Sequence, residues 1–398
     1  MMFYYIWFCI ILLVFTNIKS IIRLKKSYAF LNKKHNLSIN IDKKIIVIIP
    51  AMNEVNNVKK SINYFKSIND ICDVIYVTTS KEKSMATYNK LNSEIKIQKA
   101  NNIKVINCPN TIGTMANQIN YIIKELKDDD IVAVYNIDSQ PERKTFKYVL
   151  KNINDDVVLQ QVSFFDDKLN GIIKSAENWQ NRWSIVYEMG KYLNDIKLEF
   201  KYCIGHGLFL KKKIFDKIGY FSESEINEDN EFGYRLNINN ISIKPIPFME
   251  QADFARSKKI YIKQQSTWVN GPLYAFKYFK NNKKTFKNFI LSVLNFKAFL
   301  SWWLFPLLCY SCIICSAIFD IRLFVLTLFL VIFYITGINY FANKLLIKSN
   351  YIKNKYHIDI VSDLLFFSLH TFGSYITFYK LITGKNNIKN KYNTEKQL

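Results

Sequence analysis

The stretch IVAVYNIDSQP, residues 131–141, decides the fold of this chain. Its first five residues are apolar, and polar residues and a proline follow at once. A short apolar run without polar alternation predicts a strand that is covered on both faces. Asp138 stands at the end of this strand, where an α/β sheet opens onto its ligand crevice and where many enzymes hold a metal and a phosphate. The pattern has one carboxylate where a pair spaced Asp-x-Asp would be expected.

The same strand pattern recurs on both sides of this stretch and alternates with helical segments. The predicted strands are Ile45–Pro50, Val74–Val77, Ile103–Asn107, Ile131–Asn136 and Val157–Phe165. Predicted helices between them include Val55–Ile68 and Asn117–Leu126. This alternation predicts an α/β fold, Rossmann-like, with a mostly parallel sheet.

Long apolar segments flank the α/β region. Residues 3–22 have the length and composition of a membrane helix, and two more apolar segments, about 295–318 and 323–342, follow near the end of the chain. A weaker segment near 361–382 contains Asp363 and His370, and it could cross the membrane, re-enter it or lie flat. The α/β region is therefore expected to sit between membrane segments.

Basic residues suggest how the chain lies at the membrane. The region after the first apolar helix is strongly basic, which places it in the cytoplasm by the positive-inside rule. Residues 256–290 are basic and aromatic, as in helices at a membrane surface. The expected organisation is a membrane helix (1–22), an α/β domain (43–255), interfacial helices (256–290), C-terminal membrane helices (291–382) and a basic tail (383–398). The protein is thus expected in the cell membrane, multi-pass, with its α/β domain cytoplasmic.

The net charge of +23 does not indicate a nucleic-acid partner. Only six of the 55 basic residues are arginine, the chain is rich in Lys, Asn and Ile, and no nucleic-acid recognition motif occurs. Anionic membrane lipids are the expected acidic partner. The seven cysteines form no metal-ligand pattern, and their spacing suggests no disulfide framework, so a reducing compartment is expected.

Four stretches in order resemble the membrane-bound branch of the family 2 glycosyltransferases of GT-A fold. They are VIIPAMNE (47–54), YNIDSQP (135–141), NEDNEFGYRL (227–236) and QQSTW (264–268). The first resembles the family's first strand and loop. The others resemble its Asp-x-Asp, Thr-Glu-Asp and Gln-x-x-Arg-Trp motifs. The resemblance covers about residues 43–290 and loosely the helical tail.

The resemblance implies a role for each matching residue. Asp138 would hold Mg²⁺ or Mn²⁺, which neutralises the leaving diphosphate, and Asp229 would be the catalytic base. The implied nucleotide-binding residues are Pro50, Ala51, Asn53, Glu54 and Asn136. The implied acceptor-binding residues are Gly205, His206, Glu228, Gln264 and Trp268.

Simpler interpretations stand beside these roles. Asp138 and Ser139 could cap a helix that starts near Pro141. Glu228 and Asp229 could stabilise a helix N-terminus, with Glu231 and Arg235 paired at i, i+4. His206 could be an ordinary turn residue, the 50–54 segment a strand-end turn, and Trp268 an interfacial anchor.

The chain departs from the family pattern in four places. Asn136 replaces the first acid of Asp-x-Asp, and Thr267 replaces the arginine of the last motif. Met115 replaces a frequent lysine, and VTTSKEKS (77–84) stands where many members carry an acidic base-binding loop. One carboxylate can still hold a metal whose other ligands are phosphate oxygens and water.

The sequence therefore predicts a membrane-anchored inverting glycosyltransferase. It would transfer a sugar from a nucleotide sugar to a lipid-linked or glycan acceptor in cell-envelope or extracellular polysaccharide synthesis. One alternative is a processive polysaccharide synthase, although three or four membrane helices are few for a pore. The other is an inactive membrane scaffold that keeps the glycosyltransferase fold.

Overall fold

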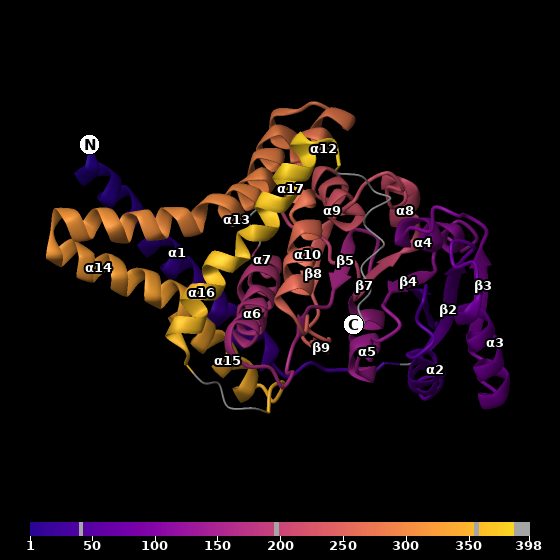
Figure 1. The fold of residues 1–398 in the computed structure, drawn as a ribbon. Helices are drawn as coiled ribbons and strands as arrows, with labels where there is room; N and C mark the ends of the chain where they lie inside the picture. The colour runs from indigo at the N-terminus through magenta and orange to yellow at the C-terminus, as the bar shows by residue number, and fades with distance from the viewer. Residues whose placement is uncertain (40–42, 195–198, 354–357, 386–398) are drawn as a thin grey trace. The chain divides into compact units, whose positions relative to one another are not determined.

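A computed structural model of the chain describes residues 1–39, 43–194, 199–353 and 358–385. The chain divides into two compact units, each of which is described by itself (Figure 1). We call residues 34–163 and 200–252 the sheet unit. Residues 1–33, 164–199 and 253–398 form the helical unit.

The sheet unit is built on a seven-stranded, mostly parallel sheet of order β3-β2-β1-β4-β7-β5-β8. Its strands are β1 (Ile45–Pro50), β2 (Cys72–Thr79), β3 (Ile103–Cys108), β4 (Ile131–Val134), β5 (Val157–Gln160), β7 (Leu208–Lys211) and β8 (Ser242–Pro245). β7 runs antiparallel to both of its neighbours, and every other pairing is parallel. The predicted fold class is confirmed.

The five predicted strands are present, but several of their ends differ: β2 is two residues longer at each end, and β3 is one residue longer. β4 ends at Val134, two residues early, because the chain turns at Asn136, whose carbonyl accepts a hydrogen bond from Ser139 N at 3.1 Å. The run 157–165 is divided into β5 and β6 (Ser163–Phe164), and β6 pairs with β9 (Glu250–Gln251) in a separate two-stranded sheet.

Helices of the sheet unit cover the sheet. They are α2 (Val58–Lys66), α3 (Ala86–Gln98), α4 (Met115–Ile123), α5 (Arg143–Asn152), α8 (Lys212–Ile218) and α9 (Glu228–Ile238). Apolar side chains of β1, β2 and β4 are buried against α2 and α5 in one core, which includes Phe65, Tyr135 and Phe146. Side chains of both strand faces are buried, which explains why the strands read as continuous apolar runs.

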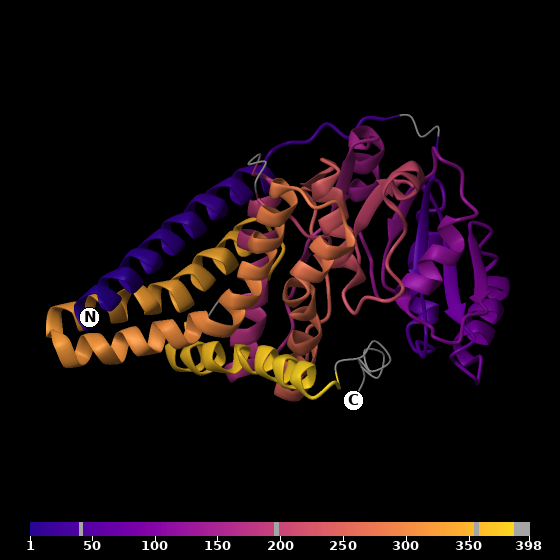
Figure 2. The same ribbon diagram turned by 90° about the horizontal axis from the view of Figure 1, so that it is seen from above.

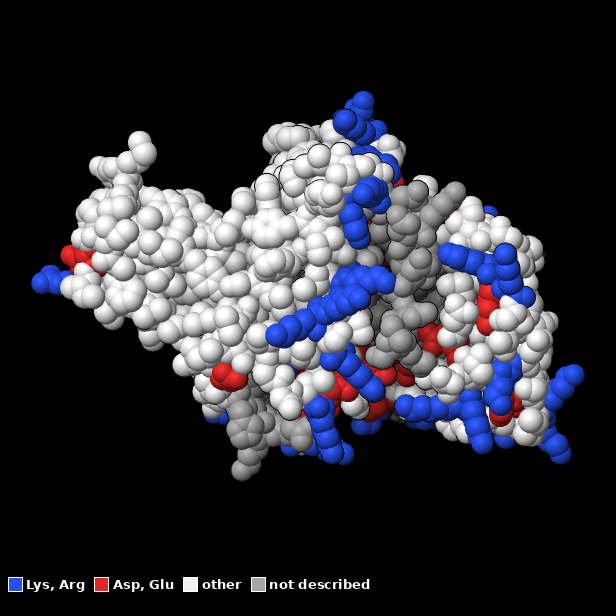
Figure 3. All heavy atoms as spheres, in the orientation of Figure 1, with Lys and Arg blue, Asp and Glu red and all other residues white. Residues whose placement is uncertain are grey.

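Among its described residues, the helical unit contains three helices that are long and apolar enough to cross a membrane: Met2–Leu31, Phe286–Phe319 and Ile321–Lys348. The first is α1 and the second is α13; the third comprises α14 (Ile321–Ile332), a π-helical segment η2 (Phe333–Gly337) and α15 (Ile338–Lys348). α1, α13 and α14 pack side by side (Figures 1 and 2). The visible face of this bundle is almost uncharged (Figure 3), which suits contact with lipid.

The break between the second and third apolar helices lies where the charges predicted it. Asp320 caps α14, because its Oδ1 accepts hydrogen bonds from Arg322 N at 2.7 Å and Leu323 N at 3.3 Å. The weaker apolar segment forms two helices of 11 residues each, α16 (Ile360–His370) and α17 (Phe372–Ile382). Each is shorter than the roughly 20 residues that a spanning helix needs.

Residues 256–290 contain the helices α10 (Lys258–Trp268), α11 (Asn270–Leu273) and α12 (Ala275–Asn281) and the start of α13. The helical unit also includes α6 (Gly171–Arg182), the π-helical η1 (Trp183–Met189) and α7 (Gly190–Tyr192). This grouping differs from the expected boundaries, which put residues 164–199 with the α/β domain. The reason is packing: Arg182 is fully buried, with its guanidinium 4.4 Å from the Trp179 ring centre and 4.2 Å from that of Tyr334.

Candidate functional site

The turn after β4 carries Asn136 and Asp138. Both side chains are partly exposed, whereas Ser139 is buried. α5 begins only at Arg143, with Glu142 at its N-cap position. Asp138 and Ser139 therefore do not cap this helix, and the simpler interpretation of Asp138 is wrong. Its carboxylate lies at the carboxyl end of a central strand, the expected place for a ligand contact.

A glycine loop lies against this strand end. Gly207 donates a hydrogen bond to Val134 O at 2.8 Å and accepts one from Gln161 N at 2.7 Å. Its φ is +63°, and a Cβ atom there would lie 2.9 Å from the Gln161 Cβ, so this position requires glycine. The loop that ends at Gly207 is thus fixed beside the end of β4.

The other glycine of the loop lies against Asp229. A Cβ atom at Gly205 would lie 3.4 Å from Oδ2 of Asp229 and 3.7 Å from Cε of Met115. Burial raises the pKa of the nearby Cys203 thiol well above its ordinary value, and the Asp229 carboxylate adds to this rise. The loop therefore connects the Asp138 turn with Asp229.

Asp229 lies in the first turn of α9. Glu228, Asp229 and Glu231 all lie in this turn, where the helix dipole favours carboxylates. Oδ1 of Asp229 accepts a hydrogen bond from Asn230 N at 2.8 Å, and the side chain remains partly exposed. Glu228 is 5% exposed. The helix-dipole interpretation is consistent with this geometry, and it does not exclude a catalytic role.

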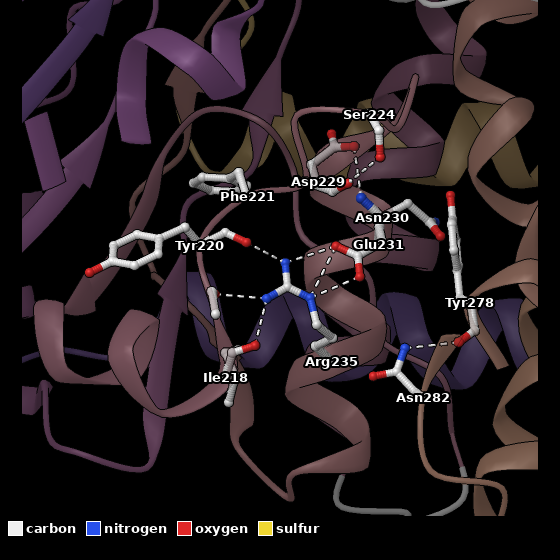
Figure 4. Close-up of polar contacts among 12 residues, drawn as sticks. Ile218, Tyr220, Phe221, Ser224, Asp229, Asn230, Glu231, Arg235, Tyr278 and Asn282 are labelled. Atoms are coloured by element: carbon white, nitrogen blue, oxygen red, sulfur yellow. Dashed lines mark hydrogen bonds and ion pairs between the residues drawn. The ribbon is translucent and has the colours of Figure 1, made fainter. Parts of the chain in front are cut away.

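Arg235 fixes the segment that precedes α9 (Figure 4). Its guanidinium donates to the carbonyls of Ile218 and Gly219, each at 2.7 Å, and of Tyr220 at 2.6 Å. It also pairs with Glu231 at 2.8 Å, as the i, i+4 spacing predicted. Five hydrogen-bond donors in one planar fork make arginine suited to hold several acceptors at once.

The residues expected to line a nucleotide follow β1. Pro50 ends the strand, Ala51 is buried, and Asn53 adopts a left-handed φ of +59°. Asn53 N donates to Oε2 of Glu82 at 3.1 Å, and Glu54 N donates to Oγ1 of Thr87 at 3.0 Å.

Sequence reasoning missed the role of Glu82. Glu82 is 6% exposed, and its carboxylate also accepts a hydrogen bond from Thr87 N at 2.9 Å, so it connects the loops that follow β1 and β2. It is the only acid in VTTSKEKS, the stretch that departs from the family's acidic loop. Gln118 was also missed: its Nε2 donates to Ala51 O at 3.2 Å and to Val77 O at 2.6 Å, which joins the ends of the same two strands.

Gln264 and Trp268 lie on α10, in the helical unit, so the sheet unit alone does not contain every predicted site residue. Gln264 is partly exposed and Trp268 is 40% exposed. Gln265 between them is buried, and α17 packs closely on it, because a Cβ atom at Gly373 would lie 2.6 Å from the Gln265 Cβ.

Residues 160–341 match the family model described as glycosyl transferase family group 2. This segment, which is less than half of the chain, is similar to that family. The predicted recognition is thereby confirmed, and so is glycosyl transfer as the general class of function.

The fold of this chain is similar to that of a solved mannosyltransferase, PcManGT from Pyrobaculum calidifontis, in complex with GDP-Man and Mn²⁺. The TM-score is 0.60 at 11% sequence identity, and the match covers 94% of this chain and 99% of the other. At this identity the likeness concerns the fold. No curated protein matches this chain in sequence.

The oxygen ligands available in the turn after β4 fit a divalent cation that shares its coordination with substrate. Among the described residues, no group of three or more His, Cys, Asp or Glu side chains could hold a metal. The turn after β4 supplies one carboxylate, Asp138, and the amide of Asn136. Mg²⁺ commonly uses only one or two protein carboxylates and completes its shell with phosphate oxygens and water.

Proposed function

We propose that this chain is a membrane-anchored inverting glycosyltransferase. It transfers a sugar from a nucleotide sugar to a hydroxyl of a lipid-linked or glycan acceptor, in the synthesis of cell-envelope or extracellular polysaccharide. The observation that carries the proposal is the loop of Gly205 and Gly207, which joins the end of β4, where Asp138 lies, to Asp229 at the start of α9. The family match and the fold shared with a GDP-Man complex support it.

The proposed mechanism is a single displacement. The Asp229 carboxylate accepts the proton of the acceptor hydroxyl, whose oxygen forms a bond to the anomeric carbon of the sugar. The bond from that carbon to the diphosphate oxygen breaks, and the electron pair leaves with the diphosphate. One displacement inverts the anomeric configuration and needs no covalent enzyme intermediate.

Each group has a part in this scheme. Asp138, with Asn136 beside it, would hold Mg²⁺ or Mn²⁺, and the bound cation would neutralise charge on the leaving diphosphate. Pro50, Ala51, Asn53 and Glu54 would line the nucleotide. Gly205, His206, Glu228, Gln264 and Trp268 would contact the acceptor.

The apolar helices support the membrane part of the proposal. Three helices in the described residues could span a membrane, and the basic regions 19–34 and 344–356 favour a cytoplasmic catalytic domain in a multi-pass cell-membrane protein. A pore for a growing polysaccharide requires several helices around it. Three candidate spans therefore favour single transfers over processive synthesis.

The test is binding and hydrolysis of nucleotide sugars by the purified full-length protein in detergent. We expect Mn²⁺- or Mg²⁺-dependent binding of one nucleoside diphosphate and its sugar. Asp138→Asn should abolish both metal-dependent binding and transfer, because an amide lacks the charge that holds the cation. Asp129→Asn is the matched control, since Asp129 is exposed in the same unit just before β4.

Two outcomes would contradict the proposal. Full activity of Asp138→Asn would exclude this residue as the metal ligand. A wild-type protein that binds no nucleoside diphosphate would instead favour the inactive scaffold.

A further inference from the structure

The carboxylate of Glu250 is buried in the sheet unit beside His206. Glu250 lies on β9 and is 3% exposed; its backbone N donates to Val162 O at 3.0 Å. Its Oε2 lies 3.4 Å from Nδ1 of His206, and this oxygen accepts no hydrogen bond from the described residues. A buried carboxylate is costly unless an opposite charge or hydrogen bonds compensate it.

Two further titratable groups near Glu250 do not neutralise it. These are the phenols of Tyr64 and Tyr135, whose pKa values are raised, mainly by burial and further by the Glu250 charge. Both therefore stay neutral. Their hydroxyls donate elsewhere, that of Tyr64 to Pro141 O and that of Tyr135 to Oε1 of Gln161. His206 is thus the group positioned to balance the charge of Glu250.

His206 lies between the two glycines of the loop of Gly205 and Gly207. Gln160 fixes the backbone on both sides: its Nε2 donates to His206 O at 2.8 Å, and its Oε1 accepts from Ile204 N at 2.9 Å. The imidazole turns Nδ1 towards Glu250 and keeps 21% of its side-chain surface exposed. It is therefore both anchored and accessible to a ligand.

Charges of both signs lie near this loop: Arg235 of α9 acts on Cys203, but it is paired with Glu231 at 2.8 Å, and the others named here are acidic. Asp229 of α9 lies beside Gly205 of the loop. Gly207 is hydrogen-bonded to the end of β4, and the turn that follows this strand carries Asp138. The Cys203 thiol within the loop stays protonated, because burial raises its pKa. Acidic neighbours favour the protonated form of a histidine.

A cation in this loop would compensate for a departure from the family pattern within the sheet unit. Met115 stands in place of a frequent lysine. The Cε of Met115 would lie 3.7 Å from a Cβ atom at Gly205, so an uncharged side chain contacts the loop there. A phosphate bound at this loop requires another positive group.

We propose that Glu250 is a positioning residue that holds His206 as a cation, and that this imidazolium binds a phosphate oxygen of the substrate. The inference rests on the proposed function, which supplies a phosphate-bearing substrate. The phosphate is that of the donor diphosphate or of a phosphorylated lipid acceptor; both present the same anionic oxygens to the loop.

The charge of His206 can be measured without any substrate. The chain has four histidines, so the ring signal of His206 in histidine-labelled full-length protein is assigned by its loss in His206→Gln. Glu250→Gln should lower the pH at which His206 loses its proton by about one unit or more. An unchanged titration in Glu250→Gln would overturn the coupling, whether or not the protein binds nucleotides.

The matched control for this measurement is Glu94→Gln. Glu94 is also a buried glutamate of the sheet unit with one cationic partner, because its carboxylate pairs with Lys90 at 2.9 Å. It should leave the His206 titration unchanged. If it shifts that titration as much as Glu250→Gln does, the effect is not specific to the pair.

Phosphate binding is tested with three probes: UDP or GDP with Mn²⁺, a polyprenyl monophosphate in micelles, and inorganic pyrophosphate. His206→Gln should weaken binding about tenfold for the probe whose phosphate it contacts. His206→Lys should restore the affinity, and the affinity should then no longer decline with rising pH. A purely structural role of His206 predicts neither result. His35→Gln is the control, since His35 packs on the rings of Tyr148 and Phe248.

The outcomes separate this inference from the proposed function. A loss confined to the nucleotide probe assigns His206 to the donor, and a loss confined to the lipid assigns it to the acceptor. Unchanged affinity of His206→Gln for all three probes would overturn its phosphate role, while sugar transfer by that variant would leave the proposed function intact. Absence of nucleotide binding in the wild type would contradict the proposed function, and the His206 titration and pyrophosphate binding would still decide the inference.

Discussion

At the scale of single residues, a substitution of Asp229 distinguishes a catalytic role of this carboxylate from a role in helix stabilisation. Removal of a positioned general base costs on the order of 10²–10⁴-fold in rate, whereas loss of a helix-terminal charge costs about 0.3–1 kcal/mol of stability. Asp229→Asn can still accept the hydrogen bond from Asn230 N. We therefore expect near-normal folding and nucleotide affinity with transfer almost abolished, measured as single-turnover transfer beside nucleotide binding.

The neighbouring carboxylate is the control for that variant. Glu228→Gln changes the same charge in the same helical turn, and it should reduce transfer less if Glu228 only orients the acceptor. Retention of a tenth or more of the rate by Asp229→Asn would place the base elsewhere.

At the scale of elements, Arg235 holds the segment before α9 in place. Lysine has the same charge but a single ammonium, which cannot reach the three carbonyls of residues 218–220 and the Glu231 carboxylate together. Arg235→Lys should lower the free energy of unfolding by about 2–4 kcal/mol and reduce transfer. Arg143→Lys, at an exposed pair with Asp70, should change stability by less than about 1 kcal/mol in the same denaturation experiment. Equal effects of the two variants would contradict this role of Arg235.

At the scale of the whole molecule, the apolar helices predict a topology. Residues 33 and 348 should be cytoplasmic, and residue 322 should lie on the far side of the membrane. Single cysteines at these positions should react with an impermeant maleimide accordingly: Arg322→Cys in intact cells, and Lys33→Cys and Lys348→Cys only after permeabilisation. Six of the seven native thiols are buried, and replacement of the partly buried Cys315 by alanine gives the background. Labelling of residue 33 from outside would contradict the cytoplasmic placement.

The sequence by itself determined the class of fold and the position of most elements. Buried strands are recognisable as short apolar runs, and membrane-length helices as long ones, because burial imposes its pattern locally. The same local logic placed Asp138 after a strand, Asp229 in a first helical turn, and Glu231 one turn from Arg235.

Only the tertiary structure decided which of these residues meet. The antiparallel strand β7 lies between β4 and β5, and this order places the loop of Gly205 and Gly207 beside both β4 and α9. The pairing of β6 with β9 forms the small sheet in which Glu250 lies, beside His206. Contacts of this kind depend on strand order and on turns between distant segments. No local pattern of residues encodes them, which is why neither Glu82 nor Glu250 could be assigned a role from the sequence.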